Sequence, residues 1–191
     1  MRFQKILSYD VYGSEQTARF DRVCSLLNQT IDPPSDAPDG LNAHNAVVFS
    51  SPRLRAITGI DCDTASEVII EPALNEIPFE LRQCCTADDL EARGSVAVRE
   101  AFLYLFCNNQ LATPHQELQS EFEHILTLSS ENPDALAVSH TFRLRLLDVY
   151  VKTGRTLFER PESIHEYLNP AEHWLAFGSF VQISSSHPEN T

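Results

Sequence analysis

Three short runs of apolar residues stand out along the chain, and each is continuous rather than alternating. They are residues 46–49 (AVVF), 68–70 (VII) and 135–138 (ALAV). A continuous run of this length is typical of a strand in a sheet that is covered on both faces. Two further strands are predicted near the ends of the chain, one from Phe3 to Tyr9 and one, with better alternation, as an edge strand from Trp174 to Ile183.

Between these runs, apolar residues recur at helical spacing. The predicted helices cover residues 14–29, 95–108, 116–129 and 142–151. Alternation of strands and helices predicts right-handed crossovers and a largely parallel sheet. We therefore predict an α/β fold, a three-layer α/β/α arrangement around a mostly parallel central sheet.

Two segments depart from this alternation, and neither is long enough to divide the chain. Residues 31–45 are rich in Pro, Asp and Gly and predict a surface loop. Residues 184–191 form a polar tail. The prediction is one domain over residues 1–183 followed by that tail, which suits a chain of 191 residues.

Composition narrows the possible functions. The net charge of −13 argues against nonspecific nucleic-acid binding, and an anionic substrate would need a local cluster of arginines. No apolar stretch is long enough to predict a membrane span, and no secretory signal is apparent, so a cytoplasmic location is expected. The five cysteines and the histidines show no metal-ligand spacing, so neither a metal nor a cofactor is predicted.

Residues that directly follow the three inner strands carry the candidate chemistry. Ligands of an open parallel sheet bind beyond the carboxyl ends of its strands. The segments at those ends are SSPRLRA (residues 50–56), EPALNE (71–76) and SHTFRLR (139–145). Arginines, carboxylates and a histidine are thus predicted to meet at one edge of the sheet.

This combination suits a phosphoryl group. The planar guanidinium of arginine can pair with two phosphate oxygens at once. A histidine can donate to a third oxygen or act as nucleophile or acid–base, and a carboxyl group can protonate the leaving oxygen. Helices that start near Pro52 and Thr141 would direct their N-terminal dipoles at the anion.

The same segments carry a family resemblance. AVVFSSPRLRAITG resembles the strand–SSP–x–x–RA segment of the histidine phosphatase superfamily, whose fold is phosphoglycerate-mutase-like. VIIEPALNEIPFE resembles its strand followed by L-x-E, and ALAVSHTFRLRLL its VSH-x-x-x-x-R segment. GSEQT, at residues 13–17, is similar to the G-x-x-Q-A helix that precedes them. The four matches occur in the family's order over roughly residues 13–150.

The resemblance implies a role for each matching position. Arg55 would clamp the phosphate and His140 would steady the transferring phosphoryl group. Glu76 stands where many members place the general acid, and Ser51 would either bind the substrate or only shape the turn. Arg145 is a further candidate for substrate binding.

Two other arginines near these positions receive no role. Arg53 and Arg143 are expected on the solvated surface.

The resemblance fails at the N-terminus. The family begins with a strand that ends in Arg-His-Gly, whose histidine accepts the phosphoryl group, and this sequence has no such triplet. If KILSYDVYG is the first strand, residues 9–12 stand where Arg-His would be. If MRFQ instead matches the family's downstream R-F-Q-G, the first strand is absent. Both alignments lack the nucleophile.

Three hypotheses follow. The chain is a truncated or divergent phosphatase or phosphomutase, of the phosphoric monoester hydrolase class, that acts on a small phosphate ester. Alternatively, it is a pseudoenzyme that binds a small phosphorylated molecule or inorganic phosphate without covalent chemistry. A third reading is a structural interaction protein. Loss of a nucleophile can cost on the order of 10⁶ in rate, so weak or absent turnover is expected.

Overall fold

The computed structural model describes residues 2–5, 45–53, 56–57, 60, 64–172, 174 and 180–182. The strands are β1 (Arg2–Lys5), β2 (Val47–Ser50), β3 (Glu67–Ile70), β4 (Leu136–Ser139) and β5 (Phe180–Gln182). The α-helices are α3 (Ala87–Arg93), α4 (Ser95–Cys107), α5 (His115–Glu131) and α6 (Thr141–Lys152), and three short 3₁₀ helices are η1 (Pro72–Leu74), η2 (Leu81–Gln83) and η3 (Pro161–Glu166).

The sheet has the strand order β3-β2-β4-β1-β5 and is mostly parallel. Four strands, β3, β2, β4 and β1, run parallel to one another. The fifth strand, β5, is antiparallel to β1 at one edge of the sheet. The mixed α/β class, the parallel sheet and the edge strand near the C-terminus are therefore confirmed. The predicted inner strands and the helices at 95–108, 116–129 and 142–151 also occur, with bounds shifted by one or two residues.

The N-terminal residues form an interior strand. Arg2–Lys5 pairs in parallel with Leu136–Ser139, so the carboxyl end of β1 reaches the same edge as that of β4. The prediction of an N-terminal strand is confirmed, and this strand begins one residue earlier than predicted. The predicted continuation of that strand to Tyr9, the helix at 14–29, nearly all of the loop at 31–45 and the tail at 184–191 lie outside the described residues.

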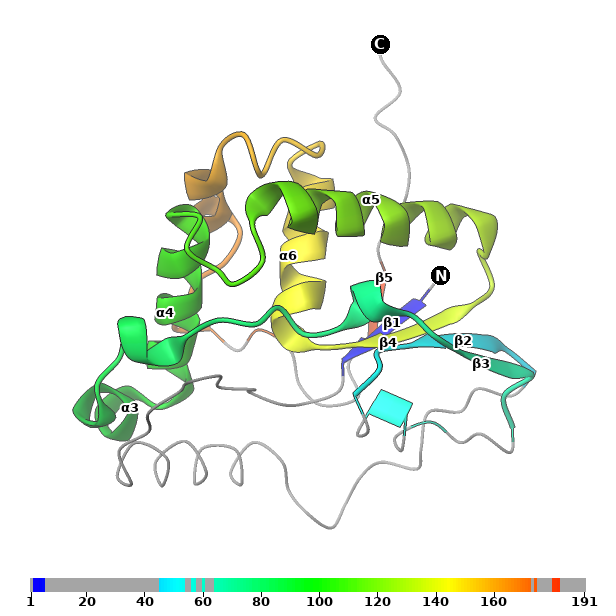
Figure 1. Cartoon of the computed structure of the whole chain (residues 1–191), viewed down its shortest axis with the longest axis horizontal. Coiled ribbons are helices and arrows are strands. Elements are labelled where there is room, and N and C mark those ends of the chain that lie inside the picture. Colours follow the sequence, from blue (N-terminus) through cyan, green and yellow to red (C-terminus); the bar gives the residue numbers. More distant parts are fainter. Residues whose placement is uncertain are drawn as a thin grey trace.

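Both faces of β2 and β4, which lie inside the sheet, are buried, which explains why these two strands are continuous apolar runs. Successive side chains of a strand point to opposite faces. Phe49 and Ala137 belong to a large core with α4, α5 and α6, which contains most of the buried residues. Val48 and Val138 belong to a second, smaller core on the other face. Figure 1 shows α5 and α6 on the same side of the sheet.

The joint between α3 and α4 shows how local sequence sets the helix bounds. Thr86 and Asp89 form a reciprocal capping box at the start of α3. Gly94 ends α3 and begins α4 with a φ of 53° and a ψ of −130°, a conformation that residues with a Cβ rarely adopt. The chain can therefore turn sharply between the two helices.

An aromatic cluster holds α4 and α6 together. The Phe102 ring of α4 lies 4.3 Å from that of Phe142 in α6 and 5.4 Å from that of Phe79, measured between centroids. Trp174 packs edge-on against Phe142 at 5.6 Å. Because Phe142 is the second residue of α6 and lies two residues after His140, this cluster also fixes the end of β4.

We expect Phe102→Ala to lower the free energy of unfolding by about 3–5 kcal/mol, because it removes a buried ring and leaves a cavity. Tyr104→Ala, two residues along the same helix, removes a ring that is 57% exposed and should change it by no more than about 0.5 kcal/mol. Urea titration of both variants measures the difference. Equal losses would contradict the assignment of this cluster to the core.

Candidate functional site

The carboxyl ends of β2, β3 and β4 lie side by side. Ser50 is in register with Ile70 on one side and with Val138 on the other. The amide of Ser51 donates to the Val138 carbonyl at 3.0 Å, and the amide of Glu71 donates to the Ser50 carbonyl at 2.8 Å. The segments that follow the three strands therefore begin at one edge of the sheet.

Ser51 and His140 meet at this edge. The Ser51 Oγ lies 2.9 Å from the His140 Nε2, although the residues are 89 positions apart in the sequence. Both side chains are 0% exposed. His140 is also the N-cap of α6, since its carbonyl accepts the Leu144 amide. The position of α6 therefore determines where this imidazole lies.

Asn75 connects the segments that follow β2 and β3. Its Oδ1 accepts from the Arg53 Nε and from the Glu76 amide, each at 3.0 Å, and lies 3.5 Å from the Ser51 Oγ. Two of these partners can only donate, which fixes the orientation of the amide group. The prediction of a solvated Arg53 was wrong, because this side chain is half-buried against Asn75.

Glu76 is a buried carboxyl group that caps α6 from another segment. It is 4% exposed, and its Oε1 accepts the amides of Ile77 and Arg143, each at 3.1 Å. The Oε2 is buried and has no hydrogen-bond partner within the described part of the chain. Burial raises the pKa of Glu76 to about 7, although the donated N–H groups and the Arg143 charge oppose the shift.

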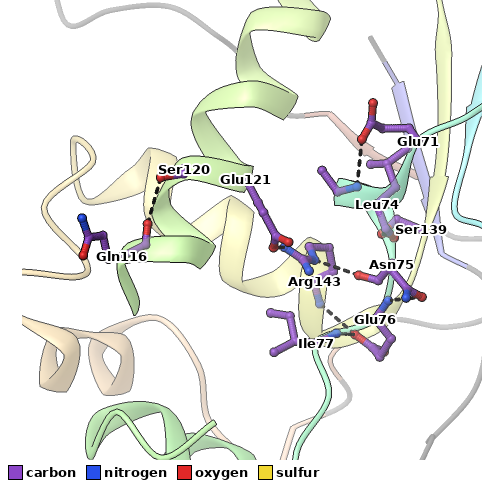
Figure 2. Close-up of polar contacts among 11 residues, drawn as sticks. Glu71, Leu74, Asn75, Glu76, Ile77, Gln116, Ser120, Glu121, Ser139 and Arg143 are labelled. Atoms are coloured by element: carbon purple, nitrogen blue, oxygen red, sulfur yellow. Dashed lines mark hydrogen bonds and ion pairs between the residues drawn. The ribbon is translucent and has the colours of Figure 1, made fainter. Parts of the chain in front are cut away.

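Arg143 lies between α5 and the loop that carries Asn75 and Glu76, as Figure 2 shows. Its side chain is 2% exposed, its Nε donates to the Asn75 carbonyl at 2.8 Å, and its guanidinium forms an ion pair with Glu121 of α5. The guanidinium carbon also lies 5.6 Å from the centre of the Phe122 ring. The prediction that Arg143 is solvated was wrong, because both η1 and α5 cover this side of α6.

Other polar contacts tie η1 to its surroundings. The Glu71 Oε1 accepts the Ala73 amide at 2.8 Å, and its Oε2 lies 3.1 Å from the Nε2 of His124 on α5. Ser139 Oγ donates to the Leu74 carbonyl at 2.6 Å. The loop that carries Asn75 and Glu76 is thus held from β4, α5 and α6 together.

The five predicted site residues fall into three groups. Ser51 and His140 contact each other, and Glu76 contacts the first turn of the helix that His140 caps. Arg145 is partly exposed and pairs with Asp148 of its own helix at 3.3 Å. Arg55 lies outside the described residues.

Sequence reasoning overlooked Asn75 and Glu121. A signal for Asn75 existed, since asparagine commonly accepts backbone amides in turns. No signal marked Glu121, which resembles any other acidic residue on an amphipathic helix.

No metal site is apparent in the part of the chain that the structure covers. Among the described residues, no group of three or more His, Cys, Asp and Glu side chains could hold a metal ion. Among the described helices, none combines the length and the apolar character needed to cross a membrane.

Comparison with known proteins adds no assignment. No family model, no curated protein and no solved structure matches the chain.

The raised pKa of Glu76 predicts a pH-dependent stability. A carboxyl group whose pKa is raised from 4.5 to about 7 on folding stabilises the protein fully below pH 4.5 and loses this effect as the pH rises through 7. Relative to Glu76→Gln, the wild type should therefore lose roughly 3 kcal/mol of unfolding free energy between pH 4.5 and pH 8. Urea titrations across this range measure the difference, and the exposed Glu117→Gln should keep the wild-type profile. Parallel profiles for wild type and Glu76→Gln would contradict the assignment.

Because Arg143 is buried, breaking its ion pair with Glu121 should cost more stability than breaking an exposed ion pair. Glu121→Gln removes the charge that faces a buried guanidinium and should cost about 3 kcal/mol of stability. Glu100→Gln breaks the exposed pair with Arg93 and should cost less than about 1 kcal/mol. Thermal or urea unfolding compares the two variants, and a similar small cost in both would show that Arg143 needs no partner.

Proposed function

We propose that this chain is a histidine-phosphatase-like protein with a phosphoglycerate-mutase-like fold, which binds a small phosphate ester or inorganic phosphate with weak or absent turnover. The observation that carries the proposal is the 2.9 Å contact between Ser51 and His140. These residues come from the two sequence segments whose resemblance to the superfamily is most detailed, and they meet at the carboxyl edge of a parallel sheet, where such folds bind ligands.

The neighbouring groups suit an anion. The guanidinium of Arg53 is positioned by Asn75 next to Ser51, and Arg55, two residues later, is the arginine that the resemblance implies as the phosphate clamp. A guanidinium binds phosphate oxygens in pairs. His140 would donate to a further oxygen of the bound group. A local cationic group is necessary because the chain as a whole carries a charge of −13.

Glu76 has the protonation behaviour of a general acid. A carboxyl group with a pKa of about 7 is protonated in about half of the molecules at neutral pH and can donate this proton to a leaving oxygen. In the proposed site it is the group that would supply such a proton if any turnover occurs.

The missing nucleophile limits this chemistry. Lys5, the last residue of β1, is in register with Ser139 and so brings the end of β1 next to the residue before His140. No Arg-His-Gly occurs there or elsewhere in the sequence. This absence favours the second candidate, a phosphate-binding or regulatory pseudoenzyme. In both cases we propose a cytoplasmic protein that needs no cofactor.

Anion binding tests the proposal. We expect the wild type to bind orthovanadate or inorganic phosphate in calorimetry, and Arg55→Ala to weaken this binding about 10- to 100-fold by removing charge-assisted hydrogen bonds. Arg160→Ala, which removes an exposed arginine of η3's N-cap, should bind as the wild type does. Binding that is absent from the wild type would favour the structural alternative.

Hydrolysis of p-nitrophenyl phosphate separates enzyme from pseudoenzyme. Little or no turnover is expected from the wild type, because the covalent route has no histidine nucleophile. Any turnover observed should disappear in His140→Ala, with circular dichroism as the check on folding. Robust turnover that survives His140→Ala would refute the assignment of the site.

A further inference from the structure

A pocket of about 310 Å³ lies between η2, α3 and α4, apart from the proposed phosphate site. Two adjacent cysteines, Cys84 and Cys85, both line it, together with the exposed Tyr104 and the ion pair of Arg93 and Glu100. Figure 1 shows α3 and α4 at the opposite end of the molecule from β2 and β3. None of these residues contributes to the site around His140.

The two thiols differ in accessibility. Cys84 is half-buried, whereas Cys85 is 8% exposed and its Sγ donates to the Ala97 carbonyl at 3.4 Å. Both cysteines are free. A reagent that enters the pocket therefore reaches Cys84 first and Cys85 after its weak hydrogen bond opens.

We propose that Cys84 and Cys85 form a dithiol site for a monosubstituted trivalent arsenical or an electrophile of the same chemical class. Two S–H bonds and the arsenic–oxygen bond break, two As–S bonds form, and both thiol protons leave with the oxygen as water. Arsenic stays trivalent throughout, so the step needs no oxidant or reductant. The organic substituent would lie in the pocket against Tyr104 and the methyl group of Ala101.

The protonation of the thiols favours this class over a divalent metal ion. Burial raises the pKa of both cysteines, and that of Cys85 reaches about 11 because the charges of Asp89 and Cys84 add to the effect. A divalent cation binds thiolates and must displace two protons into solvent. The arsenical instead takes up those protons in the water it releases. Raised thiol pKa values therefore penalise metal binding, whereas the arsenical reaction releases no net proton into solvent.

Phenylarsine oxide is the probe for this proposal, with the full chain kept reduced. We expect one equivalent to be retained as an adduct that has lost water, by intact mass spectrometry, in the presence of excess glutathione. A dithiol such as dimercaptosuccinate should remove it. Cys84→Ser and Cys85→Ser should each retain the probe about 100-fold more weakly, because each loses the second, intramolecular bond. Cys107→Ser, which removes a half-buried cysteine on another surface, should behave as the wild type does.

The outcomes separate this site from other thiols and other ligands. If Cys85→Ser does not fold by circular dichroism, Cys84→Ser decides alone, because its side chain is only half-buried. Unchanged retention in Cys84→Ser, or an adduct mapped by peptide mass spectrometry to Cys24 or Cys62, would overturn the proposal. Tighter retention of Zn²⁺ than of the arsenical by the same pair would show that the ligand class is wrong. None of these results depends on phosphate binding.

Discussion

The buried guanidinium of Arg143 organises the region around the candidate site. It binds the Asn75 carbonyl, the Glu121 carboxylate and the face of Phe122, so one cation joins the loop after β3 to α5 and α6. A charge that is 2% exposed is stable only when its hydrogen bonds are satisfied. These partners come from separate elements, and the loop that carries Asn75 therefore has little freedom to move independently of the helices.

This constraint extends to the residues proposed to bind phosphate. Asn75 is held through its backbone by Arg143, and its side chain in turn holds Arg53 and approaches Ser51. Ser51 contacts His140, which begins the helix that carries Arg143. The contacts thus form a closed circuit through three segments. A site built in this way is organised before a ligand arrives, which lowers the cost of ordering it on binding.

The sequence predicted the framework better than the contacts within it. Residues 46–49 and 135–138 were recognisable as strands because a strand buried on both faces has no polar positions to interrupt it. Residues 68–70 were recognisable because all three are β-branched, although this strand is only partly buried. Because these strands are parallel, the residues that follow their carboxyl ends were correctly predicted to lie in one region, and these include Ser51, Glu76 and His140. Arg143 was misjudged because its environment is made by α5 and η1, which are distant in sequence, and a charged residue on a helix is usually solvated. Two of the three side-chain partners of Asn75 likewise come from the segment after β2, although its place in a turn was a local signal.

Glu76 shows how one carboxyl group can satisfy a structural and a chemical requirement together. Its Oε1 accepts two backbone amides, and one of these belongs to the first turn of α6. A neutral carboxyl group still offers this acceptor through its carbonyl oxygen, while the proton resides on the other oxygen. The Oε2 is the buried atom without a hydrogen-bond partner in the described structure, so a proton there removes the charge that burial disfavours. Capping of α6 and a pKa of about 7 are therefore compatible, and both result from placing this carboxyl group against the end of a buried helix.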